Sequence, residues 1–216
     1  MSALVAPSST WALLASNFGA FALAVVFKWP LAALLWPYWF QSVVIGYFSR
    51  KRILALTDFS TEGMTEGSDE WPVPETDEAK KRLARFFVMH YGFFHLGYAV
   101  FLVAITPDLS VLDWIGLGVT AAGFAWTHKI SYDRNIAADT AGRPVLSTMA
   151  FIPYLRVVPM HFAIMLGSAQ IHPGRHSLAG LAILLFFVLK TTSDVGMHYV
   201  EHRILQKNPR PSASLS

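Results

Sequence analysis

Four ionisable side chains recur at intervals of four near the end of the chain, in the run KTTSDVGMHYVEH. They are Lys190, Asp194, His198 and His202. On an α-helix this spacing places them along one face. A carboxylate next to imidazoles can bind a divalent metal, act as a general base or relay protons. The simplest alternative is an i,i+4 ion pair between Lys190 and Asp194, which would neutralise both charges.

Two other apolar segments also contain ionisable residues. The segment HYGFFHLGY carries His90 and His95. Five residues turn a helix by about 140°, so these two histidines diverge and one of them should face the interior more fully. The segment PYLRVVPMH carries Arg156 and His161, together with Pro153 and Pro159, which can kink a helix.

The surroundings of these residues indicate a membrane. Hydrophobic residues make up 54% of the chain and charged residues 14%, which is an unusual balance for a soluble protein. A helix needs about 20 apolar residues to cross a bilayer. We therefore predict an all-α, polytopic bundle of about six transmembrane helices forming a single membrane domain. The six apolar runs cover roughly 10–27, 31–48, 83–105, 112–127, 149–170 and 177–202.

The distribution of basic residues predicts the orientation of this bundle. Most of the 17 Lys and Arg residues lie in the polar loop 49–82, in the loop 129–143 and in the tail after residue 202. Basic residues favour the cytoplasmic side, so both termini should be cytoplasmic. The basic ends of loop 49–82 suit contact with anionic lipid headgroups. Nothing in this charge pattern suggests a nucleic-acid partner, whereas a homo-oligomer or a larger membrane complex stays possible.

Counting inward from the cytoplasmic helix ends gives the depth of the ionisable residues. Most of them come out at roughly 10 to 16 Å, with His95 and Lys190 somewhat deeper and His198 somewhat shallower. Three helices thus bring nitrogen and oxygen ligands to one layer, and the chain contains no Cys. We therefore predict a divalent metal site, for Zn²⁺ or Fe²⁺. The candidate ligands are His90, His95, His161, Asp194 and His198.

The predicted function is hydrolysis of a lipid-type substrate by metal-activated water, with Asp194 as the candidate catalytic residue. Lys190, Arg156 and Gln41 are candidate electrostatic or substrate-binding groups. One alternative is a transporter or proton relay that uses the same residues without a tightly bound metal. Another is a haem-binding or accessory subunit of a membrane complex, with two histidines as axial ligands.

Four segments resemble a prokaryotic integral-membrane family catalogued as domain of unknown function 6498. They are YWFQSVVIGYF (38–48), HYGFFHLGYAVF (90–101), RVVPMHFAIMLG (156–167) and LKTTSDVGMHYVEH (189–202). The resemblance implies a multi-helix protein of the prokaryotic inner membrane and no particular activity. The family's second-helix pattern has Glu-Asn where this chain has Gln41-Ser42. That difference removes a carboxylate from the site.

Overall fold

The computed structural model describes residues 8–27, 29–66, 71–155, 157–162, 184, 187–193 and 195–196. The fold is all-helical apart from one small hairpin, which agrees with the predicted all-α class. The helices are α1 (Ser8–Val26), α2 (Leu31–Ala55), α3 (Asp77–Ile105), α4 (Val111–Ala141) and α5 (Leu146–Leu155). The hairpin pairs β1 (Thr65–Glu66) with β2 (Trp71–Pro72) in antiparallel register. Residues 157–162 and 187–193 are also helical.

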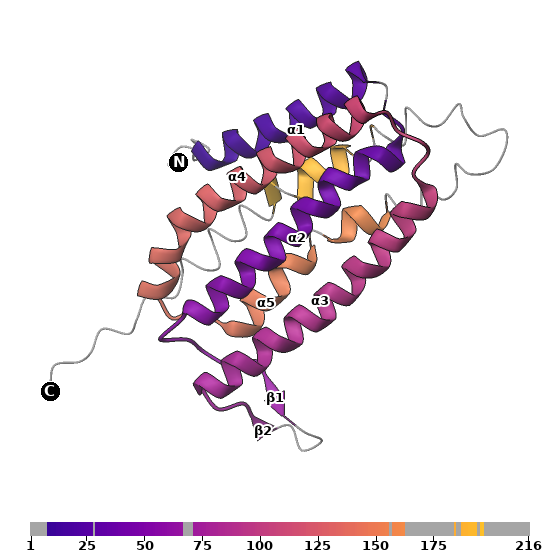
Figure 1. Ribbon diagram of the computed structural model, residues 1–216. Helices are drawn as coiled ribbons and strands as arrows, with labels where there is room; N and C mark the ends of the chain where they lie inside the picture. The colour runs from indigo at the N-terminus through magenta and orange to yellow at the C-terminus, as the bar shows by residue number, and fades with distance from the viewer. Residues whose placement is uncertain are drawn as a thin grey trace, which may run out of the picture.

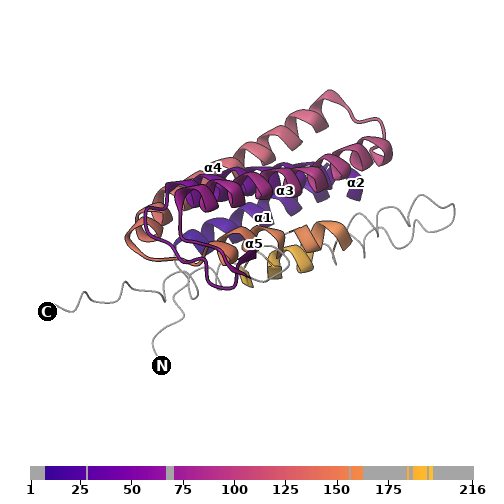
Figure 2. The same ribbon diagram turned by 90° about the horizontal axis from the view of Figure 1, so that it is seen from below.

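Helix α2 is the centre of the bundle. It packs against α3, α4 and α5, while α1 packs against α4, as Figures 1 and 2 show from two sides. Two apolar clusters fill the space around it. One includes Leu34, Leu102 and Phe124, and the other includes Ile53 and Phe87. Side chains on different faces of α2 therefore meet different neighbouring helices.

Three helices extend beyond the predicted apolar runs. Helix α2 continues past residue 48 to Ala55, α3 begins at Asp77 instead of residue 83, and α4 continues past residue 127 to Ala141. The added turns of α2 and α4 contact each other where Arg52 pairs with Asp139. Thr76 caps α3 by accepting a hydrogen bond from the backbone of Ala79. The predicted loop 129–143 is mostly the end of α4.

The last two predicted helices are described only in part. The predicted run 149–170 begins with α5, which starts at Leu146, and helical residues continue over 157–162. Residues 187–193 and 195–196 of the predicted run 177–202 are helical. The rest of both runs lies outside the described residues.

The connection between α2 and α3 is packed against the rest of the protein. Ser60 pairs with Val145 in a short parallel bridge, through hydrogen bonds that join it to Pro144 and Leu146. The buried Lys80 ammonium donates a hydrogen bond of 2.6 Å to the carbonyl oxygen of Leu56. This part of the predicted solvated loop 49–82 therefore ties the α2–α3 connection to the start of α5.

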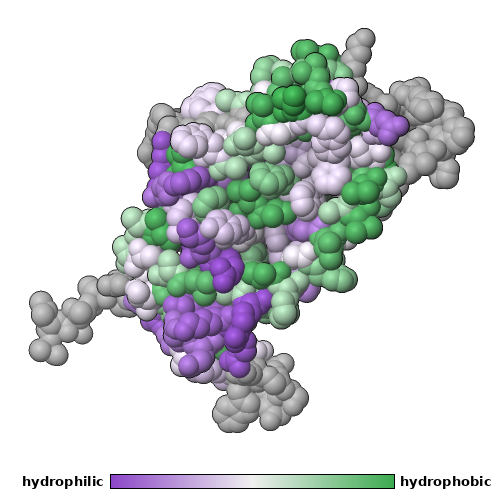
Figure 3. All heavy atoms as spheres, viewed as in Figure 1, coloured by the Kyte–Doolittle hydropathy of each residue, from purple (hydrophilic) through white to green (hydrophobic). Residues whose placement is uncertain are grey.

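The outer surface of the bundle is rich in large apolar side chains. Among the described helices, α3 is the one long and apolar enough to cross a membrane, judged by length and composition. Hydrophilic residues gather around the end that carries β1, β2 and the start of α3, whereas hydrophobic residues predominate toward the other end (Figure 3). The exposed apolar residues of α3 are Phe86, Val88, Met89, Phe93, Phe94, Leu96, Val100 and Val103.

Candidate functional site

Polar and charged side chains lie inside the bundle, around α2. Burial of such groups costs free energy unless they are hydrogen-bonded, so their partners indicate how the interior is organised. The buried polar residues of the described helices are Asn17, Gln41, Ser42, Lys80, His95, Thr120, Asp139 and Lys190. Lys80 and Thr120 donate to backbone carbonyl oxygens. The others belong to three separate groups, on the α3, α4 and α1 sides of α2.

The group between α2 and α3 contains Ser42, Tyr91 and His95. The Nε2 atom of His95 lies 2.8 Å from Ser42 Oγ, which in turn lies 2.7 Å from the Tyr91 hydroxyl. The Tyr91 hydroxyl also donates to the carbonyl oxygen of Ser42 at 3.0 Å. The Nδ1 atom of His95 lies 2.8 Å from the Tyr91 carbonyl oxygen. Both ring nitrogens of this buried histidine are therefore engaged.

The acceptor of one contact fixes the position of one hydrogen atom in this cluster. A carbonyl oxygen only accepts, so Nδ1 of His95 carries a hydrogen in this arrangement. A neutral His95 then accepts from Ser42 through Nε2, and the three side chains supply three hydrogens for four contacts. A protonated His95 donates to Ser42, Ser42 donates to Tyr91, and each of the four contacts has its own hydrogen. The four contacts are therefore compatible with either protonation state of His95, provided that the hydroxyl hydrogens of Ser42 and Tyr91 reorient.

The rings of this cluster are held in place by close packing. The rings of Tyr91 and His95 stack with centroids 4.1 Å apart. A Cβ atom at Gly46 would lie 2.7 Å from the Tyr91 ring, so the glycine makes room for it. The indole nitrogen of Trp39 donates to the His95 carbonyl oxygen at 2.8 Å. The geometry is therefore set by the packing of α2 against α3.

The second group joins α2 to α4 and borders a cavity. The amide nitrogen of Gln41 lies 3.0 Å from Nε2 of His128. Below this pair, a cavity of about 50 Å³ between α2, α4 and α5 is lined by His128, Ser49, Ser131 and Asn135 among others. Since a water needs roughly 10–15 Å³ of such volume, the cavity has room for a few water molecules.

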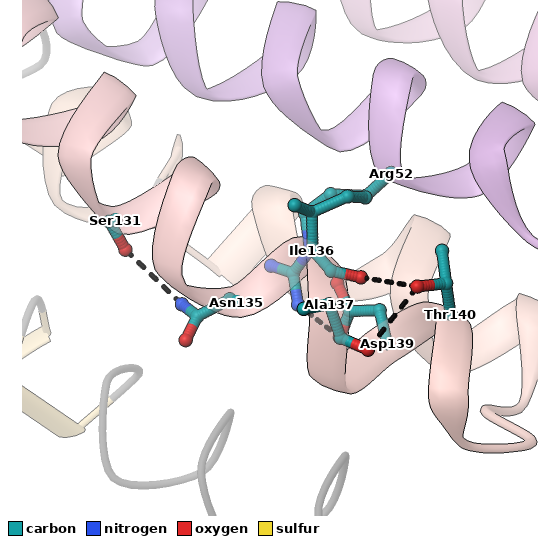
Figure 4. A network of polar contacts seen from close by, with 7 residues as sticks. All are labelled: Arg52, Ser131, Asn135, Ile136, Ala137, Asp139 and Thr140. Carbon is teal, nitrogen blue, oxygen red and sulfur yellow. Dashed lines mark hydrogen bonds and ion pairs between the residues drawn. The ribbon is translucent and has the colours of Figure 1, made fainter.

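A buried ion pair lies beside this cavity, and its Arg52 is one of the lining residues. Figure 4 shows Arg52 reaching from α2 to the carboxylate of Asp139 on α4. Nε of Arg52 lies 2.5 Å from Asp139 Oδ2, and Nη2 lies 3.0 Å from Oδ1. The side chains are only 14% and 5% exposed. Such a two-point contact fixes the guanidinium group against the cavity wall.

The third group surrounds Lys190. Its ammonium donates to Asn17 on α1 at 2.8 Å. It also lies over the rings of Tyr38 and Phe124, at 4.5 and 5.2 Å from their centroids. These contacts offset the cost of burying a cation between α1, α2 and α4. The predicted partner Asp194 lies outside the described residues.

His90 and His161 lie on the outer side of the α3–α5 contact. His95 is buried and His90 is exposed, as the 140° rotation between them predicts. Nδ1 of His90 lies 2.9 Å from the Tyr154 hydroxyl, and Nδ1 of His161 lies 3.3 Å from the Tyr98 hydroxyl. Each histidine thus has its own tyrosine.

The predicted metal ligands are not brought together within the described part of the chain. No three His, Asp or Glu residues among the described ones lie close enough to share an ion. Asp194, His198 and Arg156 lie outside the described residues, so the structure places neither the predicted catalytic carboxylate nor the predicted pairing with Lys190.

Several residues of the interior groups were not among the predicted site residues. His128 follows directly after the predicted apolar run 112–127, but it lies within α4 and borders the cavity. Its spacing to Ser131, Asn135 and Asp139 is that of one helix face and could have revealed the site. The roles of Tyr91 and Asn17 depend on contacts between helices and have no comparable signal in the sequence.

The fold and these groups define a class of protein, a helical bundle with an apolar exterior and hydrogen-bonded polar groups around a central helix. The chain belongs to a family of unknown function, domain of unknown function 6498, which it matches over residues 2–211. Neither the curated proteins nor the solved structures contain a match.

Proposed function

We propose that this protein is a multi-pass membrane protein of about six transmembrane helices whose interior relays protons or passes a small polar solute. Both termini are cytoplasmic, and the membrane is the inner membrane of a prokaryote. The distribution of side chains supports the membrane placement. Large apolar residues such as Phe93 (72% exposed) and Val103 (69%) lie outside, while His95 (4%) and Lys190 (6%) lie inside. Water would favour the opposite arrangement.

The observation that carries the relay function is the Ser42–Tyr91–His95 cluster. Its four contacts accommodate either protonation state of His95 with no movement of heavy atoms. Ionisable groups inside a membrane commonly serve such pathways. Across α2, the Gln41–His128 pair leads to the cavity at the Arg52 end, which can hold water. The first group lies on the α3 side of α2, and the second lies on its α4 side.

The same geometry argues against Ser42 as a nucleophile in a serine hydrolase. The Ser42–His95 contact has the required length, but both residues are buried and Ser42 Oγ also contacts Tyr91. A substrate carbonyl could reach the oxygen only after Tyr91 had moved. A proton needs no such access.

The test is proton flux into proteoliposomes with an imposed pH gradient and an internal pH dye. Wild-type protein should conduct protons well above protein-free vesicles. His95→Gln should lose most of this flux, because glutamine can hydrogen-bond but does not titrate. His90→Gln is the matched control on the exposed face of α3 and should retain it. Equal flux in the two variants, with both folded by circular dichroism, would refute the relay.

Metal-dependent hydrolysis of a lipid-type substrate is the second candidate function. One observation favours it: His90 and His161 each engage Nδ1 with a tyrosine hydroxyl, the kind of contact that orients metal-binding histidines. The ligands would then be these two residues with Asp194 and His198. His95 would have to release one of its two hydrogen bonds to join them. Stoichiometric zinc or iron in protein purified without a His-tag would favour this function, and a haem absorbance band would favour the accessory-subunit alternative.

A further inference from the structure

A groove runs along the outside of the bundle between α2 and α4. Its volume is about 580 Å³, and its walls include Val43 and Tyr47 from α2 and Ala122 and Trp126 from α4. Clefts that bind organic ligands have volumes of roughly 300–1,000 Å³. This groove is distinct from the polar cavity, which lies between α2, α4 and α5 and is far smaller.

The walls of the groove leave large apolar surfaces uncovered. Trp126 is 69% exposed and Tyr47 is 55% exposed. The small side chains of Ala122 and Ala125 lie among these rings and hollow the surface between them. An elongated apolar ligand would cover the exposed ring faces, and each covered Å² of apolar surface favours binding.

Cationic groups lie at one end of the groove. The Lys51 ammonium lies over the rings of Tyr47 and Tyr132, at 5.7 and 5.1 Å from their centroids. Lys129 borders the groove and pairs with Asp133 at 2.6 Å. The two lysines and the single carboxylate leave this end positively charged, so it complements an anionic headgroup.

The groove is shorter than one leaflet of a bilayer. Ala122 and Lys129 are seven residues apart on α4, which is about 10 Å along the helix axis. One leaflet contributes about half of a hydrocarbon core roughly 30 Å thick. A headgroup beside Lys51 and Lys129 would therefore place the upper part of its acyl chain between Tyr47 and Trp126.

We propose that this groove is a binding site for one anionic phospholipid of the cytoplasmic leaflet. Lys51 and Lys129 bind the headgroup, and the aromatic walls bind the acyl chain. The inference rests on the membrane placement proposed above, and it adds a specific lipid to the general contact between basic loops and the bilayer.

Quenching of tryptophan fluorescence tests the site. The protein is reconstituted in phosphatidylcholine vesicles, and phosphatidylglycerol with brominated acyl chains is titrated in. Brominated phosphatidylglycerol should quench Trp126 at a lower mole fraction than brominated phosphatidylcholine does. Trp126→Phe identifies its share of the signal. Because a lysine near an anionic lipid surface is worth about fivefold in affinity, Lys51→Gln and Lys129→Gln should each raise the required mole fraction about fivefold.

Two controls separate the possible outcomes. Lys81→Gln removes an exposed lysine on α3, paired with Asp77 in the same i,i+4 way as Lys129 with Asp133, and should not alter quenching. Equal quenching by the two brominated lipids, in protein that fractionates with membranes, would overturn the specific site while leaving the membrane placement intact. Protein that stays in the soluble fraction and is quenched by neither lipid would overturn both.

Discussion

Removing one partner of the ion pair between Arg52 and Asp139 should strongly destabilise the bundle. It joins the ends of α2 and α4 through two contacts of 2.5 and 3.0 Å. Replacing Asp139 by Asn removes the negative charge and leaves the guanidinium group in its buried position. The perturbation is therefore the loss of charge compensation, with almost no change in side-chain volume.

The expected magnitude follows from burial. Removing one partner of a buried pair costs about 3–5 kcal/mol, because an uncompensated charge stays behind. Arg52 is 14% exposed, so some water reaches it and the lower end of that range applies. For a chain of this size, about 3 kcal/mol corresponds to a fall in Tm of roughly 6–12 °C.

Thermal unfolding in detergent, followed by circular dichroism, measures this effect. Arg52→Met and Asp139→Leu should each destabilise the protein, whereas the double variant should be more stable than either single one. Apolar residues of similar volume can replace a buried ion pair with little loss. The exposed pair Lys129–Asp133, with side chains 58% and 52% exposed, is the matched control. Its removal should cost about 0.3–0.5 kcal/mol.

Two results would refute this reasoning. One is a Tm for Asp139→Asn that falls no further than in the exposed-pair control. The other is a double variant whose loss equals the sum of the two single losses. Either result would mean that Arg52 and Asp139 contribute independently, through packing or through other partners.

Three further substitutions test local features of the fold. Gly46→Ala would place a Cβ atom 2.7 Å from the Tyr91 ring, and the resulting overpacking should cost about 1–3 kcal/mol in thermal unfolding and reduce proton flux. Gly116→Ala would approach the Trp29 ring to 2.9 Å and should shift the tryptophan emission spectrum, since the indole must move. Ser110→Ala removes the N-cap of α4 and should cost about 1 kcal/mol in the same melts, with rescue by Ser110→Thr.

The apolar runs predicted where helices lie but not where they end. A run of apolar residues marks the part of a helix that could lie in the hydrocarbon core of a membrane. The run ends at the first cluster of charged residues, even where the helix continues. Helix α4 continues past residue 127, and His128 and Asp139 in this part of the helix contact Gln41 and Arg52 of α2. A search for polar residues at intervals of three and four would have extended this helix correctly.

The site was predictable only as far as single helices determine it. The rotation between His90 and His95 follows from helix geometry, and their exposures agree with it. The partners of His95 follow from the register of α2 against α3, which no local pattern specifies. Counting depth brought histidines of different helices to one layer, but depth leaves the direction around each helix axis undetermined. His90 and His95 lie on the same helix but have entirely different neighbours, because they point in different directions around its axis.

The adjacent residues Gln41 and Ser42 show how α2 contributes to two of the three interior groups at once. Neighbouring positions on a helix point about 100° apart, so two consecutive side chains on a central helix meet different partners. Gln41 meets His128 on α4, and Ser42 meets His95 and Tyr91 on α3. The Glu-Asn pattern at these positions would set a carboxylate against His128 and a larger amide against the ring of His95. Each change would alter the proton balance of one group without touching the other. This dipeptide is therefore where the chain can adjust its two hydrogen-bonded groups independently.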